Sequence, residues 1–336
     1  MACRRIGLVV HEGRAAAIDT ARVVRDWAEA RCIAVTQLDV WSPDAPPHSA
    51  ADEAAFGGHP DLVVTIGGDG TLLRGVRIAV RDDAPVLGVG VGRVGFLTEV
   101  PPSEVERALD AYVSGHTTTE TRLLIGMRAS RPLSVPPGIE ALLQYGRGPL
   151  LPPPGCRPDV TAVDGYALDV TALNDVVFEK LARDRQADLG VYIDGRLFES
   201  YSADAVIVGS PTGSTAYSFA AGGPVLSPRL RALILTPVAP HMVFNRSLVV
   251  SGDEGVGVRV LDSSGPVVVS VDGQVRGVLD PGDWVDVHVA PNSARLVRLR
   301  APQFYDRLRH RFALAAAPAI GPDGAPQTLT GPPDQH

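Results

Sequence analysis

Residues 63–74 read VVTIGGDGTLLR, a strand-like run that leads into a glycine-rich turn and then into leucines with helical spacing. The amide N–H groups of such turns and the N-terminus of the following helix attract anions, so these segments often bind phosphates. Asp69 stands at the centre of the turn, where its charge opposes a phosphate. It is either a residue suited to turn geometry or a carboxylate that acts as a general base or as an outer ligand of Mg²⁺.

The same alternation of strand and helix extends through the first third of the chain and predicts a Rossmann-like α/β domain with a parallel sheet. Ligands of such sheets bind beyond the carboxyl ends of the strands, and the Gly67–Thr71 turn lies at such an end. The expected strands are 4–10, 33–40, 62–66 and 86–91, and the expected helices are 14–31, 71–80 and 103–114.

From about residue 160 the pattern changes to short strands joined by tight turns, which predicts a second, all-β domain. Asp194-Gly195 and Asp272-Gly273 are typical of two-residue hairpin turns. A helix is expected at about 303–313. The expected strands are 166–171, 188–193, 196–201, 205–208, 247–250, 256–261, 267–271, 274–279 and 284–289.

Composition excludes several classes of function. A net charge of −7 argues against a broad nucleic-acid surface, which needs clustered positive charge. Cys3, Cys32 and Cys156 have no metal-ligand spacing and fit a reducing cytosol. The apolar run Ile6–Val10 is too short for a signal peptide or a membrane helix. Lys180 is the only lysine, and because no glycine-rich loop contains one, a P-loop is excluded.

Two further turns contain residue types that suit a nucleotide site. Gly90–Gly95 spells GxGxxG, but Phe96 and Pro101 follow where a dinucleotide fingerprint requires a long helix, so it is better interpreted as a loop edging the same cleft. Residues 209–217 follow a strand and are rich in hydroxyls. Ser210, Thr212, Ser214 and Thr215 either cap a helix or, being more numerous than one cap needs, bind a polar ligand.

Acidic and amide side chains also stand at strand ends in the second half of the chain. Asn174 and Asp175 follow an apolar run, and Asp204 immediately precedes a strand. Asp272 is the first residue of an expected hairpin turn, and that position alone accounts for it.

Together these segments resemble the NAD kinases, which phosphorylate the 2′-hydroxyl of the adenosine ribose of NAD. The resemblance covers most of residues 5–312 and implies an α/β domain, a β-sandwich-like domain and a homodimer or homotetramer. The segments that match the family's motifs, in order, are GGDGTLL, the GxxxGxxGFL stretch ending at Leu97, Leu173-Asn-Asp175, SPTGSTAYSFAAGGPVL, LTPVAPHMVFNRSLVV and SVDGQ.

The resemblance implies roles for individual residues. Asp69 corresponds to the proposed catalytic base, and Gly67, Gly68, Gly70 and Thr71 to the residues that bind nucleotide phosphates. Mg²⁺ would accompany ATP, and the phosphate donor is either ATP or polyphosphate. The residues that correspond to the NAD site are Phe96, Asn174, Asp175, Asp204, Thr215, Ala216, Tyr217 and Asp272.

The predicted domain organisation combines periodicity with this resemblance. Residues 1–122 form the α/β nucleotide-binding domain, and 123–296 the β-rich NAD-binding domain, with a Pro-rich insertion at 131–160 interpreted as a loop or flap. Residues 297–314 are expected to pack back on the first domain, and 315–336 to be a disordered tail.

Three departures from the family's pattern bear on which molecule accepts the phosphoryl group. The family's Asn is Gly90 here, a Ser that precedes AGGP is Ala220, and an Asp-Gly pair is Asp204-Ala205. These changes keep other functions open, namely a kinase acting on NADH, another nucleoside or a lipid, and a catalytically silent NAD(H)-binding regulator. The hydroxyl-rich 210–218 segment argues against a lipid, and an intact Asp69 argues against a silent regulator. The principal expectation is a cytoplasmic NAD kinase that makes NADP, with no nucleic-acid or membrane partner.

Overall fold

The computed structural model describes residues 3–39, 58–92, 95–139, 151, 153–158, 165–182, 184–300, 304–312 and 314. Parts of the Pro-rich 131–160 segment and the tail from 315 therefore lie outside the described residues. Residues up to Ala301 form one compact unit. The residues from Pro302 onward form a second unit, which contains helix α7 (Phe304–Arg311) where a helix was expected.

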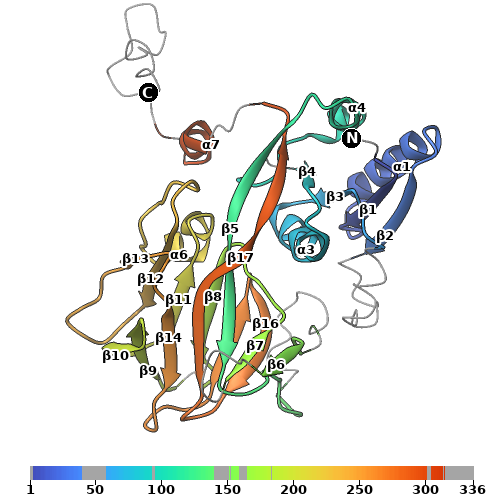
Figure 1. The fold of residues 1–336 in the computed structure, drawn as a ribbon. Coiled ribbons are helices and arrows are strands. Elements are labelled where there is room, and N and C mark those ends of the chain that lie inside the picture. Colours follow the sequence, from blue (N-terminus) through green and yellow to red (C-terminus); the bar gives the residue numbers. More distant parts are fainter. Residues whose placement is uncertain are drawn as a thin grey trace, which may run out of the picture. The chain divides into compact units, whose positions relative to one another are not determined.

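The N-terminal part contains the predicted parallel strands in the order β4–β3–β1–β2 (Figure 1). All six residues of β3 are buried, because helices cover both faces of the sheet. Helices α1 and α4 pack on one face, and α3 packs on the other through Leu72 and Val76. The elements are β1 (Arg5–Val10), α1 (Ala15–Glu29), β2 (Ala34–Asp39), β3 (Leu62–Gly67), α3 (Asp69–Ala79), η1 (Val80–Asp82), β4 (Val86–Gly90), η2 (Pro102–Glu104) and α4 (Val105–Val113).

The C-terminal part is an antiparallel β-sandwich. One layer is a six-stranded sheet in the order β13–β12–β11–β8–β15–β16, and apolar residues such as Phe178 and Val285 form the core between the layers. Its remaining elements are β6 (Cys156–Pro158), β7 (Tyr166–Leu168), β8 (Asp175–Lys180), β9 (Ala187–Ile193), β10 (Arg196–Ala203), β11 (Ala205–Gly209), η3 (Gly213–Thr215), α6 (Tyr217–Ala220), β12 (Ala232–Val238), β13 (Leu248–Ser251), β14 (Val256–Val260), β15 (Val267–Val271) and β16 (Gln274–Leu279).

Two long strands, β5 (Thr118–Ala129) and β17 (Trp284–Arg298), run side by side through both parts of the fold (Figure 1). β17 pairs with β14 of the sandwich and, through Leu296 opposite Val86, in parallel with β4. The second layer of the sandwich and the parallel strands are therefore one continuous eleven-stranded sheet.

Both predicted hairpin turns are confirmed. Asp194 and Gly195 have φ values of 49° and 75°, and Asp272 and Gly273 have 48° and 73°, so both central residues of each turn are left-handed, as a type I′ turn requires. No strand was expected at β5, β6, β8 or β12, and the structure adds all four; β6 lies at the end of the 131–160 segment that was interpreted as a loop.

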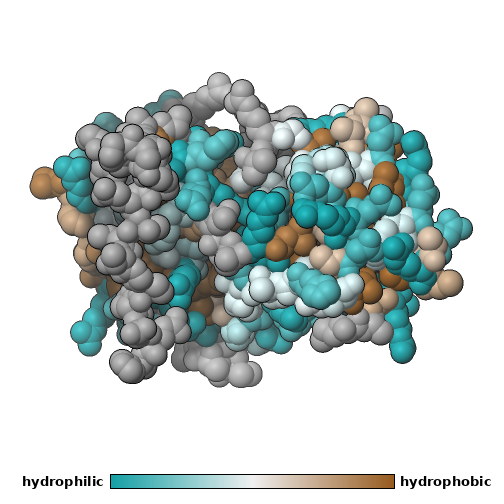
Figure 2. Space-filling view, turned by 90° about the horizontal axis from the view of Figure 1, so that it is seen from above, coloured by the Kyte–Doolittle hydropathy of each residue, from teal (hydrophilic) through white to brown (hydrophobic). Residues whose placement is uncertain are grey.

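On the face seen in Figure 2, hydrophobic residues form small patches among hydrophilic ones. No helix within the described part of the chain is long and apolar enough to cross a membrane.

Candidate active site

The GGDGT segment forms the junction between β3 and α3. β3 ends at Gly67, Gly68 precedes the helix in an extended conformation, and α3 begins at Asp69. A Cβ at Gly67 would lie 2.2 Å from Thr71 Oγ1, so only glycine fits, whereas a Cβ at Gly68 or Gly70 would meet nothing within 4 Å. The backbone at Gly68 and Gly70 is thus open to a ligand at the helix N-terminus.

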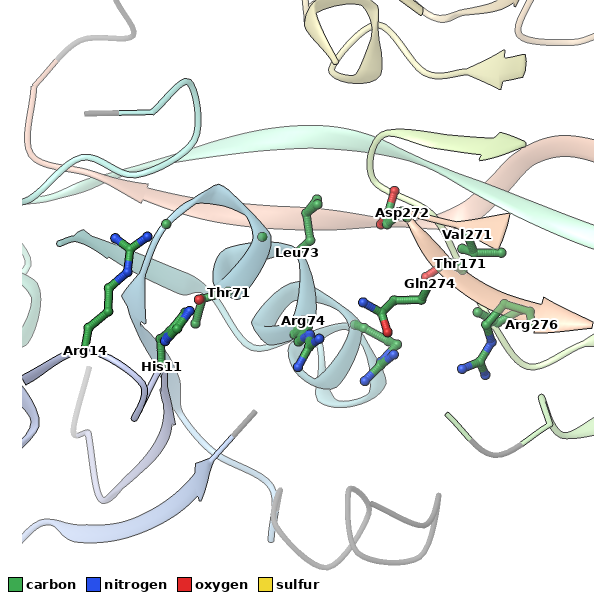
Figure 3. A pocket seen from close by; sticks show the side chains of 15 residues that line it. His11, Arg14, Thr71, Leu73, Arg74, Thr171, Val271, Asp272, Gln274 and Arg276 are labelled. Atoms are coloured by element: carbon green, nitrogen blue, oxygen red, sulfur yellow. The ribbon is translucent and has the colours of Figure 1, made fainter. Parts of the chain in front are cut away.

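This turn borders a cavity of about 330 Å³ that Gly68, Gly70 and Thr71 help to line. Figure 3 shows His11 and Arg14 at one end and Gln274 and Arg276 at the other. Arginines dominate the charged residues of the lining, and Asp272 is the only carboxylate among the described residues there. The lining arginines are Arg14, Arg74, Arg77 and Arg276.

A cavity with this charge suits a polyphosphate group. Guanidinium groups bind phosphate oxygens through paired N–H donors, and a helix N-terminus adds backbone donors. None of the four arginines was predicted from the sequence. Arg74 and Arg77 had a local signal, since they stand three residues apart on the helix that follows GGDGT. Arg14 and Arg276 come from distant segments and had none.

The Asp69 carboxylate is held by the segment after β4. It accepts hydrogen bonds from the backbone N–H groups of Phe96 (2.9 Å), Leu97 (3.2 Å) and Thr98 (3.3 Å). A Cβ at Gly95 would lie 2.0 Å from Asp69 Oδ1, so glycine is required there. A carboxylate has about four acceptor positions, so three donors fix its orientation and leave capacity for another. Phe96 thus contacts Asp69 through its backbone.

Asp272 holds a second segment in the same way. Its carboxylate accepts from the N–H groups of Leu173 (2.9 Å), Asn174 (2.7 Å) and Asp175 (3.2 Å). Burial raises the pKa of Asp272 to about 6, although the three N–H groups and Arg77 lower it. The carboxylate therefore does more than terminate a hairpin, because it joins the β15–β16 turn to the start of β8.

Asp175 is 4% exposed and lies beside Asp272. Burial, followed by the charge of Asp272, raises the pKa of Asp175 to about 7, while a hydrogen bond from the Tyr217 backbone lowers it. The folded protein therefore holds this proton more tightly than the unfolded chain does. Stability falls as pH rises from the ordinary aspartate pKa toward this raised value.

We expect Asp175→Asn to flatten this pH dependence and to raise the free energy of unfolding above about pH 7 by on the order of 1–3 kcal/mol. Urea unfolding at acidic and mildly alkaline pH measures the effect. Asp253→Asn, at an aspartate whose side chain is 81% exposed, is the control and should leave the pH dependence unchanged. An Asp175→Asn variant with the wild-type pH dependence would contradict the assignment.

The hydroxyl-rich turn after β11 uses its buried hydroxyls within the fold. Ser210 Oγ accepts from Gly213 N at 3.1 Å and donates to Leu173 O, and Ser214 Oγ donates to Pro211 O at 2.7 Å. Both serines are fully buried. These bonds tie the turn to the segment that Asp272 holds.

Of the remaining predicted residues, Thr215, Ala216 and Tyr217 belong to this turn, and Asp204 lies just before β11. Tyr217 is 41% exposed, and burial, followed by Glu179, Asp204 and Asp175, raises its pKa. Asp204 forms an ion pair with Lys180, with 2.6 Å between Oδ1 and Nζ. Thr215 and Ala216 are half-buried beside Tyr217.

The structure therefore arranges the predicted residues in two groups. The first contains the GGDGT turn with Phe96, and the second contains residues 174–175, 204, 215–217 and 272. Asp272 is the member of the second group that lines the same cavity as Gly68, Gly70 and Thr71.

Gly90 and Ala220 have different surroundings. A Cβ at Gly90 would lie 2.9 Å from Thr98 Oγ1. Thr98 therefore occupies the space that the side chain of the family's Asn would need. Ala220 is exposed at the end of α6.

Comparisons with known proteins cover both parts of the fold. Residues 6–117 match the family description "ATP-NAD kinase N-terminal domain", and residues 173–299 match "ATP-NAD kinase C-terminal domain". The chain is 60% identical over 326 residues to NAD kinase 1 of Streptomyces avermitilis, covering 96% of this chain and 91% of the relative. It is 59% identical to NAD kinase 1 of Streptomyces coelicolor, covering 98% and 91%.

Two solved structures share the fold. The yeast NADH kinase complexed with NADH has a TM-score of 0.68 at 20% identity, covering 94% of this chain and 89% of the other. An NAD kinase from Archaeoglobus fulgidus in complex with ATP has a TM-score of 0.64 at 23% identity, covering 93% and 100%. At these identities the likeness concerns the fold alone.

Proposed function

The chain belongs to the NAD kinase family, and we propose that it transfers a phosphoryl group from ATP or polyphosphate to the 2′-hydroxyl of the adenosine ribose of NAD, which gives NADP. The observation that carries this proposal is the open GGDGT turn at the N-terminus of α3, which faces a cavity lined by four arginines and Asp272.

The phosphate donor occupies this cavity. The backbone at Gly68 and Gly70 approaches its phosphates, and the α3 N-terminus and the guanidinium groups of Arg74, Arg77 and Arg276 offset their charge. Phosphoryl transfer depends mostly on positioning and on neutralising charge, so these groups replace the lysine of a P-loop.

Asp69 accepts the proton of the ribose hydroxyl as its oxygen bonds to the terminal phosphorus of the donor, and the phosphoanhydride bond breaks to release ADP or the shortened polyphosphate. The three backbone N–H groups of residues 96–98 hold its carboxylate in one orientation. The dinucleotide lies along the second group, where Asn174, Asp204 and the 215–217 segment contact it.

The cavity also fits Mg²⁺ bound together with the donor. The described residues contain no cluster of three or more His, Cys, Asp or Glu side chains that would hold a metal ion alone. Mg²⁺ in phosphoryl-transfer sites is usually bound through one or two carboxylates together with substrate phosphates, and Asp272 supplies such a carboxylate. When bound with the donor, the ion neutralises charge on the phosphates.

Product analysis tests the proposed function. The purified protein would be incubated with Mg²⁺ and either ATP or polyphosphate, and separately with NAD⁺, NADH, adenosine or diacylglycerol, and the products identified by mass. We expect NADP from NAD⁺. The absence of NADP(H) from both dinucleotides would contradict the proposal, and a product from adenosine or diacylglycerol alone would favour a different acceptor.

We also infer a cytoplasmic location from the scattered cysteines, and a homodimer or homotetramer. β10 and β13 are edge strands of the two sheets, and exposed apolar side chains gather near them. The rings of Phe198 and Phe244 meet edge to face, with 5.6 Å between their centroids. Leu197 and Val243 beside them are 58% and 102% exposed. Another copy of the chain would cover this patch.

Phe198→Asp and Phe244→Asp together are expected to convert the oligomer into monomers, because each places a charge in the apolar contact. Light scattering after size exclusion measures the mass. Ile18→Asp, at an exposed apolar residue of α1, is the control and should leave the mass unchanged. An unchanged oligomer in the double variant would place the interface elsewhere.

A further inference from the structure

We infer that a buried chain of ionic and hydrogen-bonding contacts through Arg298, Glu120 and Arg122 positions the segment that holds Asp69 relative to the turn that begins at Thr212. This inference rests on the proposed function, since it makes these three side chains positioning residues for the phosphoryl transfer. None of them contacts the cavity described above.

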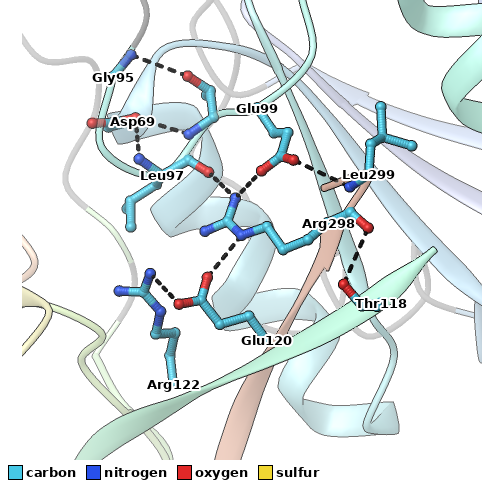
Figure 4. Close-up of polar contacts among 10 residues, drawn as sticks. Asp69, Gly95, Leu97, Glu99, Thr118, Glu120, Arg122, Arg298 and Leu299 are labelled. Carbon is cyan, nitrogen blue, oxygen red and sulfur yellow. Dashed lines mark hydrogen bonds and ion pairs between the residues drawn. The ribbon is translucent and has the colours of Figure 1, made fainter. Parts of the chain in front are cut away.

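The chain begins at the carbonyl side of the 96–98 segment. Arg298 Nη1 donates to Leu97 O at 2.9 Å and to Glu99 Oε2 at 3.0 Å. The Arg298 side chain is 3% exposed. Asp69 binds the N–H side of the same segment, so the carboxylate and the guanidinium hold it from opposite sides (Figure 4).

The chain continues along β5. Arg298 Nε donates to Glu120 Oε2 at 2.7 Å, and the other oxygen, Glu120 Oε1, lies 2.8 Å from Arg122 Nη2. Glu120 and Arg122 are two residues apart on one strand and share a face. Both side chains are largely buried, at 12% and 6% exposure.

The last link reaches the hydroxyl-rich turn. Arg122 Nη1 donates to Thr212 Oγ1 at 3.3 Å, and Thr212 directly precedes η3. Thr212 O in turn accepts from Thr215 Oγ1 at 3.2 Å. The contacts therefore run without a break from Asp69 to Thr215, a residue of the proposed dinucleotide site.

Positioning accounts for these charges better than stability does. Burying ion pairs costs desolvation, and well-packed apolar residues would often stabilise a fold equally well. Here Glu99 and Glu120 balance Arg122 and Arg298. Burial raises the pKa of Glu120, but the two guanidinium groups lower it by more. Its pKa is therefore below the ordinary value, and Glu120 stays ionised at neutral pH. A charged, dry network with fixed geometry is a suitable spacer between two turns that must align reacting atoms.

The strands that carry the chain are also the ones that reach both turns. β5 and β17 run from the parallel strands into the sandwich, and they are paired from Arg298 opposite Thr118 to Val285 opposite Ala129. A side chain on these strands can therefore touch a segment of each part.

Thr212→Val tests the last link with the least disturbance, because it removes the hydroxyl and nearly keeps the shape. We expect kcat to fall about tenfold or more, with KM for NAD and for ATP each within about threefold. Thr212→Ser keeps the hydroxyl and should restore kcat. Amide hydrogen exchange should become at least about fivefold faster at Leu97 and Thr98 in the valine variant and not in the serine variant.

Glu120→Gln tests the centre of this chain of contacts. In the double variant with Thr212→Val, the kcat loss should be smaller than the product of the two single losses, because both substitutions break the same chain of contacts. Asp283→Asn is the matched control, since it breaks the Arg131–Asp283 ion pair at the opposite end of β5. Its kcat should stay within about twofold of wild type even where it loses as much thermal stability as Thr212→Val or Glu120→Gln.

Wild-type kcat in folded Thr212→Val and Glu120→Gln, losses that multiply, or a Thr212→Ser variant as poor as the valine would overturn the inference. If the wild type forms no NADP, the positioning role fails with the proposed function. Exchange at residues 97–98 then still decides whether the two turns are coupled, so the two failures are distinguishable.

Discussion

Asp69→Asn is expected to lower kcat by about 10²–10⁴-fold, the range typical for loss of a general base. The amide cannot accept the ribose proton, whereas the dinucleotide contacts at residues 174 and 215–217 remain. NAD affinity should therefore stay within a few-fold of wild type. Steady-state kinetics and NAD titration by calorimetry measure the two effects.

The substitution also affects the contact with residues 96–98, because the new NH₂ group faces backbone donors. We expect this to cost about 1–3 kcal/mol of stability. Gly95→Ala disturbs the same contact without removing the carboxylate. Its Cβ would fall 2.0 Å from Asp69 Oδ1, so it displaces the carboxylate and leaves its chemistry intact.

A Gly95→Ala variant with a partial kcat loss and an unchanged pH profile supports a base. Wild-type kcat in a folded Asp69→Asn variant would instead assign Asp69 to holding the segment alone.

Arg77→Met is expected to lower kcat/KM for the phosphate donor by about 10²–10³-fold, because a charged donor of hydrogen bonds to phosphate is lost and the thioether keeps much of the volume. Arg77 lines the main cavity and also a second one of about 240 Å³. The Arg77 charge lowers the pKa of Asp272, so its removal raises that pKa. The pH profile of kcat/KM in the variant should therefore move to higher pH as well.

Arg81→Met is the matched control, because Arg81 follows on η1 and lines the second cavity only. With ATP its kcat/KM should remain within about threefold of wild type. Equal effects of the two substitutions would indicate general electrostatic attraction rather than a site at Arg77.

The fold was predictable where periodicity is strong and local. β3, α3 and the two Asp-Gly hairpins follow from the 62–74 segment and from the Asp194 and Asp272 turns. β8 and β12 were not expected, since short apolar runs buried on both sides have no period that distinguishes strand from helix. β5 begins with a polar run, TTET, whose three threonines are exposed, and its partner β17 lies more than 150 residues away in sequence.

The candidate site was predictable as a set of turns and not as a set of contacts. The GGDGT turn lies at a strand end as expected. The three N–H groups on Asp69 come from residues 27–29 positions away, and Arg276 reaches the cavity from β16. Such partners depend on how the sheets are assembled, which no local pattern encodes. The domain boundaries at 122 and 296 and the individual ligand contacts remain predictions.

The pairing of β17 with β4 has a consequence for biosynthesis. A ribosome releases the N-terminal strands long before Leu296 emerges, so Val86 at the start of β4 lacks its β17 partner until then, whereas residues 88–90 already bond to the nearby Glu99 and Val100. The nascent first half therefore cannot complete its sheet co-translationally. Stalled or truncated products that end before β17 should be aggregation-prone and should depend on chaperones, whereas the finished chain pairs Val86 with Leu296 of its own last strand.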